Sequence, residues 1–482
     1  MAAALWNAAD AAAATGGTAG GDWQCADIAI DSRECAPGDL FVALKGEHSD
    51  GHAYLGDVFA REAAAAMVSR EVADWPPAVG CLRVGDTLAG LRGLARAARK
   101  RCRGAIVAVT GSVGKTGVKE GLRSVLSAQG RAHANIRSFN NHVGAPLSLA
   151  RLPVDADFGI FELGMSHAGE IAPLAALVRP DCALITNIAP AHAGFFDSLE
   201  DIARAKAEIF TGMALGGTAV LNRDDGSFGL LERLAIDAGV GRIISFGTHE
   251  EADVRAERFH LHPHLSCVQA RVSGHALTYK SGLAGYHWVL NSLAVLAVVE
   301  ALGADIGLAG LALANLSAPP GRGNRHRVGW AGGTITLIDE TYNANPASMT
   351  AALGVLGGLE PGPHGRRIAV LGEMLELGAG AVEAHKALSA PIEAAAIDMV
   401  ITVGGIGTAL DDVLSPACHA GHAEDALQAL SLIERIVRPG DIVLVKGSNA
   451  LGLSRIIEKL VADNAPTTAG SSPQRAVAGG RG

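Results

Sequence analysis

The chain has 482 residues, of which 49% are hydrophobic and 18% are charged, and its formal net charge is −9. At about 150 residues per domain, this length predicts roughly three domains, each with enough apolar residues for a core. The acidic balance argues against nucleic-acid binding as the main task, because no basic excess is available to neutralise phosphates. The apolar content also argues against a disordered chain.

The seven cysteines form no CxxC pair, and their number is odd. We therefore expect neither a disulfide framework nor a zinc site, and a reducing, cytoplasmic location fits best. No Lys or Arg precedes Arg33, so the alanine-rich start lacks the positive region of a secretory signal. The longest apolar stretch, about residues 283–299, contains His287 and Asn291, and it predicts a buried helix rather than a membrane span. We expect the protein to act as a monomer.

The first hundred residues combine short helical and strand-like segments. The segments are a helix within 2–14, strands at 28–31 and 40–44, and helices near 59–68 and at 88–101. The last helix ends in a basic cluster, where we place the end of an N-terminal domain over 1–102.

Beyond this helix, apolar β-rich runs alternate with helical segments. The runs lie at 105–109, 158–161, 182–188, 218–221 and 242–246, and again at 334–338, 367–371, 399–403 and 441–445. Because apolar strands separated by helices are typical of a parallel sheet covered on both faces, we predict two further α/β domains, over 103–318 and 319–462. Residues 463–482 are rich in Pro, Gly, Ser and Thr and predict a disordered tail.

A glycine-rich loop, Thr110-Gly-Ser-Val-Gly-Lys-Thr116, follows the strand at 105–109 and precedes a helix at about 118–129. Such a loop aims backbone N–H groups and the helix dipole at an anion. Lys115 would reach the β- and γ-phosphates of ATP, and the Thr116 hydroxyl would bind Mg²⁺. The predicted nucleotide-binding residues are Gly111, Ser112, Val113, Gly114, Lys115 and Thr116. A glycine-rich turn arising by chance is the alternative, and Val109 replaces the first glycine of the general P-loop pattern.

Glu162 stands at the end of the strand at 158–161, where a carboxylate is placed to hold Mg²⁺ beside the phosphates. Farther on, Ser198 and Asp201 are spaced as a capping box at the start of a helix. Lys206 shares one face of that helix with apolar residues, so its amine is either buried or reaches past the apolar surface to solvent. A buried, neutral amine can react with CO₂ to form a carbamate, which would supply an anion for Mg²⁺.

The short loop T-G-S-x-G-K-T resembles the ATP-binding loop of the Mur ligases, which join amino acids to the peptidoglycan precursor and are related to folylpolyglutamate synthase. The string F-E-L-G-M-S from Phe161 resembles the family's version, and N-I-x-P-A-H ends at His192. The resemblance implies that His192 is a second metal-site ligand and that Lys206 is carbamoylated.

Residues 285–294 resemble the family's G-x-H-N-x-x-N-x-L-A helix, which implies nucleotide contacts for His287 and Asn291. Trp288 stands where Asn is usual. Pro320-Gly321-Arg322 resembles the P-G-R whose arginine reaches the ATP phosphates when domains close, although Arg322 also fits a solvated linker.

Asp339 follows a strand and suits ribose hydroxyls, and Tyr342 offers a stacking face. D-x-x-Y-N-A-N-P-x-S-M over 339–349 resembles the Mur branch that adds D-alanyl-D-alanine, and residues 372–378 and 446–448 resemble that branch too. The D-N-P string typical of the diaminopimelate- or lysine-adding branch is absent. The resemblance implies a nucleotide contact for Asn343 and substrate contacts for Asn345, Ser348 and Lys446.

Strings at 31–33, 38–46 and 50–52 resemble the family's UDP-sugar-binding domain, and 140–147 resembles a string that faces the substrate. The implied substrate-binding residues are Ser32, Arg33, Phe41, Lys45, Asn140 and Asn141. His142 and Asn449 depart from the family's usual residues at their positions.

The resemblance implies three α/β domains: a small UDP-binding domain, a central P-loop ATPase domain and a Rossmann-like C-terminal domain. It also implies an ATP- and Mg²⁺-dependent ligase that joins UDP-N-acetylmuramoyl-tripeptide to D-alanyl-D-alanine. The expected catalytic residues are Lys115, His192, Lys206 and Arg322. The alternatives are another Mur ligase or folylpolyglutamate synthase and, in a different class, a P-loop kinase or a nucleotide-switch protein.

Overall fold

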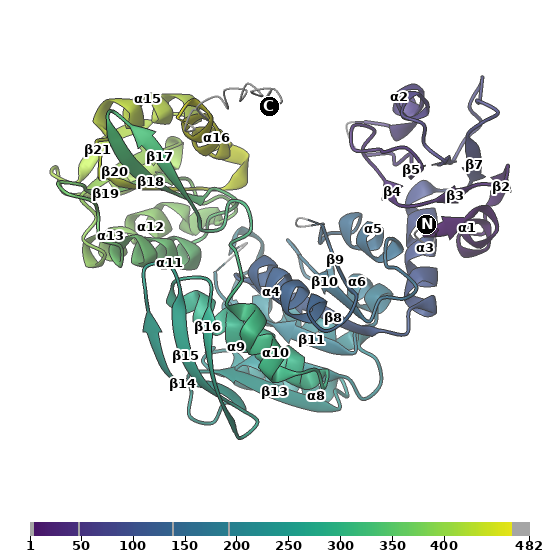
Figure 1. The fold of residues 1–482 in the computed structure, drawn as a ribbon, viewed down its shortest axis with the longest axis horizontal. Helices are drawn as coiled ribbons and strands as arrows, with labels where there is room; N and C mark the ends of the chain where they lie inside the picture. The colour runs from purple at the N-terminus through teal and green to yellow at the C-terminus, as the bar shows by residue number, and fades with distance from the viewer. Residues whose placement is uncertain (1–3, 47–48, 137–138, 191–192, 465–482) are drawn as a thin grey trace, which may run out of the picture. The chain divides into compact units, whose positions relative to one another are not determined.

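The computed structural model describes residues 4–46, 49–136, 139–190 and 193–464. The chain divides into two compact units: unit 1 runs to Pro319 and also includes 345–351 and 376–380, and unit 2 contains the rest. Unit 1 holds a five-stranded and a nine-stranded sheet, and unit 2 holds a six-stranded sheet (Figure 1). The predicted α/β fold class is therefore confirmed. The exact domain boundaries stay predictions, and most of the predicted tail lies outside the described residues.

The first sheet has the strand order β2-β7-β6-β5-β4, and all neighbours except the antiparallel pair β2–β7 are parallel. Its strands are β2 (Thr18–Gly20), β4 (Ile28–Ala29), β5 (Leu40–Val42), β6 (Ala65–Val68) and β7 (Gly80–Arg83), and β1 (Trp6–Asn7) pairs separately with β3 (Gln24–Cys25). The helices are α1 (Ala8–Thr15), α2 (Leu55–Ala60) and α3 (Thr87–Arg101).

The prediction of one alanine-rich helix near 59–68 is wrong. The helix α2 ends at Ala60, and Ala65–Val68 form the strand β6. All four β6 residues are buried, and the strand pairs in parallel with β5 and β7. A strand that is buried on both faces needs a continuous apolar run, and here this tertiary pairing overrides the helix propensity of alanine.

The second sheet has the order β16-β15-β14-β13-β12-β11-β8-β10-β9. Its strands are β8 (Ala105–Thr110), β9 (Ala132–Ala134), β10 (Phe158–Glu162), β11 (Cys182–Ile185), β12 (Thr218–Asn222), β13 (Arg242–Gly247), β14 (Val254–Leu261), β15 (Ser266–Val272) and β16 (His275–Ser281). The strands from β9 to β14 pair in parallel, whereas β14, β15 and β16 are antiparallel. The sequence analysis missed the last three strands, because their alternating exposed and buried residues lack the continuous apolar runs of a buried parallel strand.

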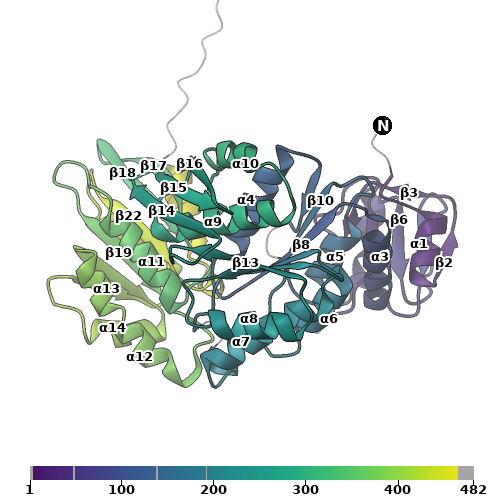
Figure 2. The ribbon, with the colours of Figure 1, turned by 90° about the horizontal axis from the view of Figure 1, so that it is seen from below.

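Helices cover both faces of this sheet. Two separate apolar clusters, one on each face, include every second residue of β8. The helices α4 (Lys115–Ser127), α9 (Tyr286–Ala301) and α10 (Ile306–Leu313) lie on one face (Figure 2). The other face carries α5 (Gly144–Ala150), α6 (Ile171–Val178), α7 (Leu199–Ala207) and α8 (Phe228–Asp237).

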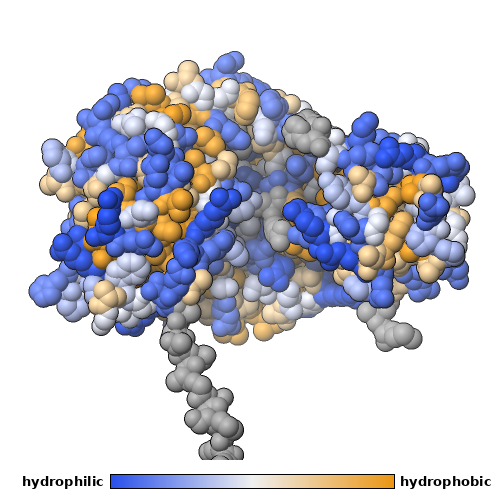
Figure 3. Space-filling view, turned by 90° about the horizontal axis from the view of Figure 1, so that it is seen from above, coloured by the Kyte–Doolittle hydropathy of each residue, from blue (hydrophilic) through white to orange (hydrophobic). Residues whose placement is uncertain are grey.

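The apolar stretch near 283–299 is the core helix α9, as predicted, with ten buried residues. Within the described part of the chain, no helix is both long and apolar enough to cross a membrane. Hydrophilic residues cover much of the face in Figure 3, with separate apolar areas between them.

The third sheet has the order β17-β18-β22-β19-β20-β21, and only β17 is antiparallel to its neighbour. Its strands are β17 (Asn324–Trp330), β18 (Gly333–Glu340), β19 (Arg367–Gly372), β20 (Met399–Val403), β21 (His419–Ala423) and β22 (Ile442–Lys446). The helices of this region are α11 (Pro346–Gly357), α12 (Ala381–Lys386), α13 (Ser389–Ala394), α14 (Thr408–Asp411), α15 (Ala426–Ile436) and α16 (Ser454–Asp463). The helices α15 and α16 pack on one face, and α12 and α13 lie on the other (Figure 1).

The last strand, β22, lies between β18 and β19, and this insertion has a consequence for ligand binding. The chain leaves β22 for α16 on one face, whereas it leaves β19 for α12 on the other. Diverging connections of this kind open a crevice at the carboxyl ends of the strands, where α/β proteins bind ligands.

A buried ion pair fixes the start of β22. The Asp441 carboxylate is fully buried and accepts hydrogen bonds from Arg366 N (2.8 Å), Arg366 Nη2 (2.7 Å) and Arg438 N (2.9 Å). The Arg366 side chain is 21% exposed. Removing the arginine would leave a buried carboxylate without its counter-ion, which is costly.

We expect Arg366→Met to lower the free energy of unfolding by about 2–3 kcal/mol, slightly less than for a fully buried pair. Urea unfolding measures this. The matched control is Arg204→Met, which removes an exposed partner of Glu200 and should cost about 0.5 kcal/mol. Equal losses for both variants would contradict the importance of burial.

Candidate active site

The glycine-rich loop lies between β8 and α4, as the sequence predicts. Gly111 and Gly114 have φ angles of 145° and 88°, which residues with a side chain rarely adopt. A Cβ atom at Gly111 would lie 1.9 Å from Thr186 Oγ1, and one at Gly114 would lie 2.8 Å from Asn291 Oδ1. The loop therefore needs glycine both for its backbone conformation and for its close packing.

The segment after β11 holds this loop in place. Asn187 accepts hydrogen bonds from Ser112 N through its carbonyl (3.0 Å) and from Val113 N through Oδ1 (2.9 Å). The Ser112 hydroxyl donates to Ala189 O (3.0 Å). Sequence analysis did not assign a role to Asn187, although a polar residue just past the strand beside the P-loop strand was a usable signal.

Lys115 lies over the loop, with Nζ 2.6 Å from Gly111 O and 3.4 Å from Ser112 O. Lys115 is also the first residue of α4, so its ammonium group lies beside the N-terminus of that helix. A cation next to the positive end of a helix is well suited to bind phosphates.

Thr116 and Glu162, two predicted metal ligands, are in direct contact. Thr116 Oγ1 donates to Glu162 Oε2 (2.8 Å), and Asn140 Nδ2 donates to Glu162 Oε1 (2.7 Å). The Glu162 residue is 1% exposed. A hydroxyl and a carboxylate oxygen are donors that Mg²⁺ prefers, and Mg²⁺ sites often use one carboxylate together with substrate phosphates. These residues therefore fit Mg²⁺.

Sequence analysis missed two buried residues near Glu162: Asn135, which holds Glu162, and Lys119, which holds Asn135. Asn135 Oδ1 accepts from Glu162 N (2.7 Å), and Asn135 O accepts from Lys119 Nζ (2.8 Å). Lys119 is fully buried and also pairs with Glu120 (2.9 Å). Its position inside the predicted helix at about 118–129 gave no sign of this role.

Lys206 is buried, with 2% of the residue exposed, so the solvent-directed alternative is wrong. Ser198 caps α7 as predicted, and its Oγ accepts from Asp201 N (3.2 Å). Burial holds the pKa of Lys206 well below its usual value, and the like charge of Lys115 lowers it further. Both effects disfavour the ammonium form.

The remaining predicted metal ligand, His192, lies outside the described residues. Among the residues that the structure describes, no three His, Cys, Asp or Glu side chains are grouped as a metal site.

The start of α9 brings Asn291 against the phosphate loop, next to Gly114 and Gly117. Trp288 is 8% exposed, and its ring would be 2.8 Å from a Cβ atom at Gly117. Trp288 thus packs into the space that Gly117 leaves open on α4. His287 lies beside it, with ring centroids 5.6 Å apart.

In unit 2, Arg322, Asp339 and Tyr342 lie together. The Arg322 guanidinium is 4.0 Å from the centre of the Tyr342 ring. The Asp339 carboxylate accepts from Gly321 N (3.1 Å) and Thr341 Oγ1 (2.6 Å). It therefore fixes this loop, and its ribose contact stays a prediction.

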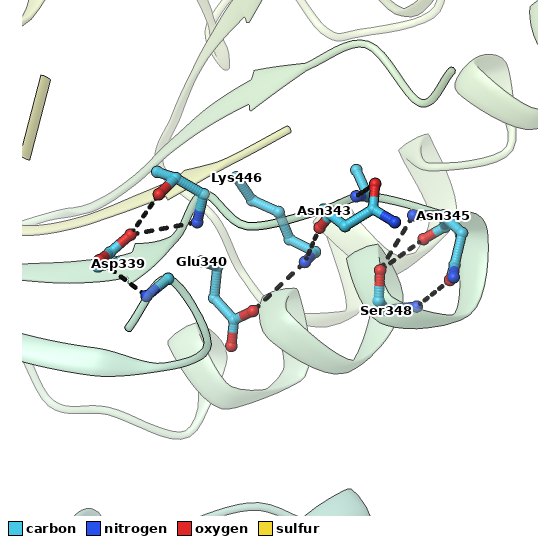
Figure 4. A network of polar contacts seen from close by, with 9 residues as sticks. Asp339, Glu340, Asn343, Asn345, Ser348 and Lys446 are labelled. Carbon is cyan, nitrogen blue, oxygen red and sulfur yellow. Dashed lines mark hydrogen bonds and ion pairs between the residues drawn. The ribbon is translucent and has the colours of Figure 1, made fainter. Parts of the chain in front are cut away.

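Lys446 is 2% exposed, and its side chain points toward Glu340 and Asn343 (Figure 4). Its Nζ lies 3.3 Å from Glu340 Oε2 and donates to Asn343 O (2.9 Å). Burial lowers the pKa of Lys446, although Glu340 opposes this shift. The structure thus gives Lys446 contacts that position the loop after β18, while its substrate contact stays a prediction.

The other predicted substrate residues have different surroundings. Asn345 Oδ1 accepts from Ser348 N (2.9 Å) at the start of α11, and Asn141 Oδ1 accepts from Gly144 N (2.9 Å) at the start of α5. Asn345 therefore caps α11, Asn141 holds the turn that leads into α5, and the substrate contacts of both stay predictions.

The N-terminal candidates are only partly at the surface. Phe41 is 1% exposed and packs in the core, which gives it a packing role. Ser32 is half-buried, and Lys45 and Arg33 are exposed. Arg33 pairs with Asp31 (2.6 Å) and lowers the pKa of that carboxyl to about 2.

Three family models match the chain. They are the Mur ligase family catalytic domain over 25–80, the Mur ligase middle domain over 109–299 and the Mur ligase glutamate ligase domain over 325–449. The chain is 34% identical over 449 residues to the UDP-N-acetylmuramoyl-tripeptide–D-alanyl-D-alanine ligase of Escherichia coli, covering 91% of this chain and 96% of that one. The ligase of the same name from Bacillus subtilis is 32% identical and covers 90% and 93%.

Solved structures agree with these relatives. A MurF crystal structure from Acinetobacter baumannii has a TM-score of 0.82 at 29% identity, covering 95% of this chain and 99% of that one. The MurF ligase of Thermotoga maritima, solved with ADP, has a TM-score of 0.75 at 27% identity and covers 91% and 97%. The fold and site are those of a nucleotide-dependent ligase, and the chain belongs to the Mur ligase family.

We expect Gly114→Ala to weaken ATP binding at least about tenfold, because its Cβ would force the loop away from Asn291. Calorimetric titration with ATP measures this. Gly239→Ala is the matched control: its φ of 79° imposes similar strain, but no atom lies within 4 Å of the new Cβ. If Gly239→Ala weakened ATP binding equally, the packing argument would fail.

Proposed function

We propose that this protein is an ATP-dependent ligase that joins D-alanyl-D-alanine to UDP-N-acetylmuramoyl-tripeptide during peptidoglycan precursor synthesis. The observation that carries the proposal is the arrangement of the P-loop at one edge of the central sheet. Lys115 lies over the loop, and the next residue, Thr116, donates a hydrogen bond to Glu162. Relatives that carry this activity in their name match about nine-tenths of the chain.

The reaction needs an activated carboxylate, because a free carboxylate has too poor a leaving group for attack by an amine. The terminal carboxylate of the tripeptide attacks the γ-phosphorus of ATP, ADP leaves and an acyl phosphate forms. The amine of D-alanyl-D-alanine then attacks the carbonyl carbon. Inorganic phosphate leaves, and the nitrogen loses a proton. Lys115 stabilises the charge on the transferring phosphoryl group, an effect typically worth about 3–4 kcal/mol for a single preorganised donor.

The Mg²⁺ ligands of the proposal are Thr116, Glu162, a carbamate on Lys206 and, from the family resemblance, His192. When bound, Mg²⁺ neutralises phosphate charge. The neutral Lys206 amine attacks CO₂ and loses one proton, which converts it into a carbamate anion. The burial of Lys206 and its lowered pKa support this step, because only the neutral amine reacts.

A monomeric state and a cytoplasmic location complete the proposal. All seven cysteines are free, which fits a reducing compartment. The substrates, ATP and a nucleotide-linked precursor, fit the same location.

The test is turnover of ATP by the purified protein with and without D-alanyl-D-alanine. We expect phosphate release to require both the UDP-sugar tripeptide and the dipeptide, and the product mass to increase by two alanine residues. Lys115→Ala should lower kcat by about 10². Extension of a folate, addition of a single amino acid or a stable phosphorylated product would each refute the proposal.

We expect Lys206→Ala to be almost inactive, because the site loses an anionic oxygen donor. Added acetate should partly restore its kcat by placing a carboxylate in the space left by the side chain. Lys115→Ala is the matched control and should gain nothing from acetate, since it lacks a cation. A fully active Lys206→Ala would exclude the carbamate.

A further inference from the structure

The loop Glu373–Leu375, which follows β19 in unit 2, is held by three separate elements. Ser448, after β22, donates its N–H to Glu373 O (3.0 Å) and accepts from Leu375 N at Oγ (2.9 Å). Ile406, after β20, donates its N–H to Glu373 Oε1 (2.6 Å). The third element is α12, through His385 Nε2, which accepts from Met374 N (2.9 Å).

His385 is 2% exposed, and its two contacts fix which ring nitrogen carries the hydrogen. Its Nδ1 lies 2.7 Å from Ala381 O. A carbonyl oxygen only accepts, so Nδ1 carries the hydrogen, and Nε2 is the unprotonated acceptor for Met374 N. Without this acceptor, the Met374 amide would be buried and unsatisfied, and loop conformations that expose it to water would be favoured.

The loop lies where the six-stranded sheet is built to bind a ligand. Its strand, β19, pairs with β22, and the two strands connect to opposite faces, which is the arrangement whose carboxyl ends bind ligands in α/β sheets. Met374 is 1% exposed and anchors the loop in the core, whereas Leu375 is 37% exposed. Because the Met374 and Leu375 amides and one Glu373 oxygen already have protein partners, the loop offers an apolar surface rather than an anion site.

We propose that His385 is a positioning residue for the dipeptide substrate, holding the loop so that Leu375 contacts the alanine methyl groups of D-alanyl-D-alanine. This inference rests on the proposed function. The phosphates of ATP are assigned to the P-loop of unit 1, and the UDP-sugar to the first sheet. An exposed apolar side chain at this end of the sheet in unit 2 fits the dipeptide, which has two methyl side chains.

The test compares His385→Leu with His385→Gln in the full-length enzyme. Gln can place Oε1 near the position of Nε2 and accept from Met374 N, whereas Leu cannot. We expect His385→Leu to raise KM for D-alanyl-D-alanine about tenfold, while KM for ATP changes less than about twofold. His385→Gln should recover most of the wild-type KM for the dipeptide.

Ser448→Ala is the second variant, because it removes the acceptor for the neighbouring Leu375 amide and should raise the same KM even if His385→Leu does not fold. Ile433→Val trims a fully buried residue of α15, in the cluster on the opposite face of the sheet, and controls for lost stability. It should lower Tm without changing KM for the dipeptide.

Hydrogen exchange of the peptide that contains Met374 gives a readout independent of catalysis. Exchange should be faster in His385→Leu than in the wild type, and His385→Gln should restore protection. Equal rises in KM for ATP and the dipeptide, or an unchanged dipeptide KM in both His385→Leu and Ser448→Ala, would overturn the inference. Wild-type enzyme without dipeptide-dependent turnover would instead refute the proposed function, and the assignment of the dipeptide with it.

Discussion

The parallel pairing of β8 with β10 and β11 is the constraint on which the nucleotide site depends. The register places Glu162 opposite Val109 and Ile185 opposite Thr110. The three chain segments therefore leave the sheet at one edge, where β8 continues into the phosphate loop. Glu162 and Asn187 contact this loop for that reason, although they lie far apart in the sequence. A change in register by one residue would turn these side chains to the other face of the sheet.

Buried lysines support this site and its counterpart in unit 2, and their surroundings differ in an instructive way. Lys119 and Lys446 each lie beside a carboxylate and donate to a backbone carbonyl of a loop. Each offsets part of the cost of burying a charge and fixes that loop. At Lys206, burial and the like charge of Lys115 both disfavour the ammonium form. A lysine paired with a carboxylate, as at Lys119 and Lys446, is suited to hold a loop in position. A lysine whose surroundings disfavour the ammonium form, as at Lys206, is suited to react as a neutral amine.

The candidate sites of both units are built in the same way. In each, a parallel sheet aligns strand ends, and polar side chains that follow neighbouring strands or lie on an adjacent helix satisfy the backbone groups of the loops there. Asn187 does this for the phosphate loop, and Ser448 and His385 do it for the loop after β19. Loops held by several elements lose little further entropy when a ligand binds, which favours both affinity and specificity.

The sequence by itself determined the features that depend on short-range order. The strand, loop and helix around Lys115 were predicted from a run of apolar residues, two glycines and a helical pattern. The cap at Ser198 was predicted from the spacing of Ser198 and Asp201. Only the tertiary structure decided features that depend on distant partners: β6 is a strand because two strands flank it, and Lys206 is buried because its helix packs against the central sheet. Local patterns fix backbone propensity, whereas burial and hydrogen-bond partners depend on which distant segments the sheet brings together, as with the Met374 amide held by His385.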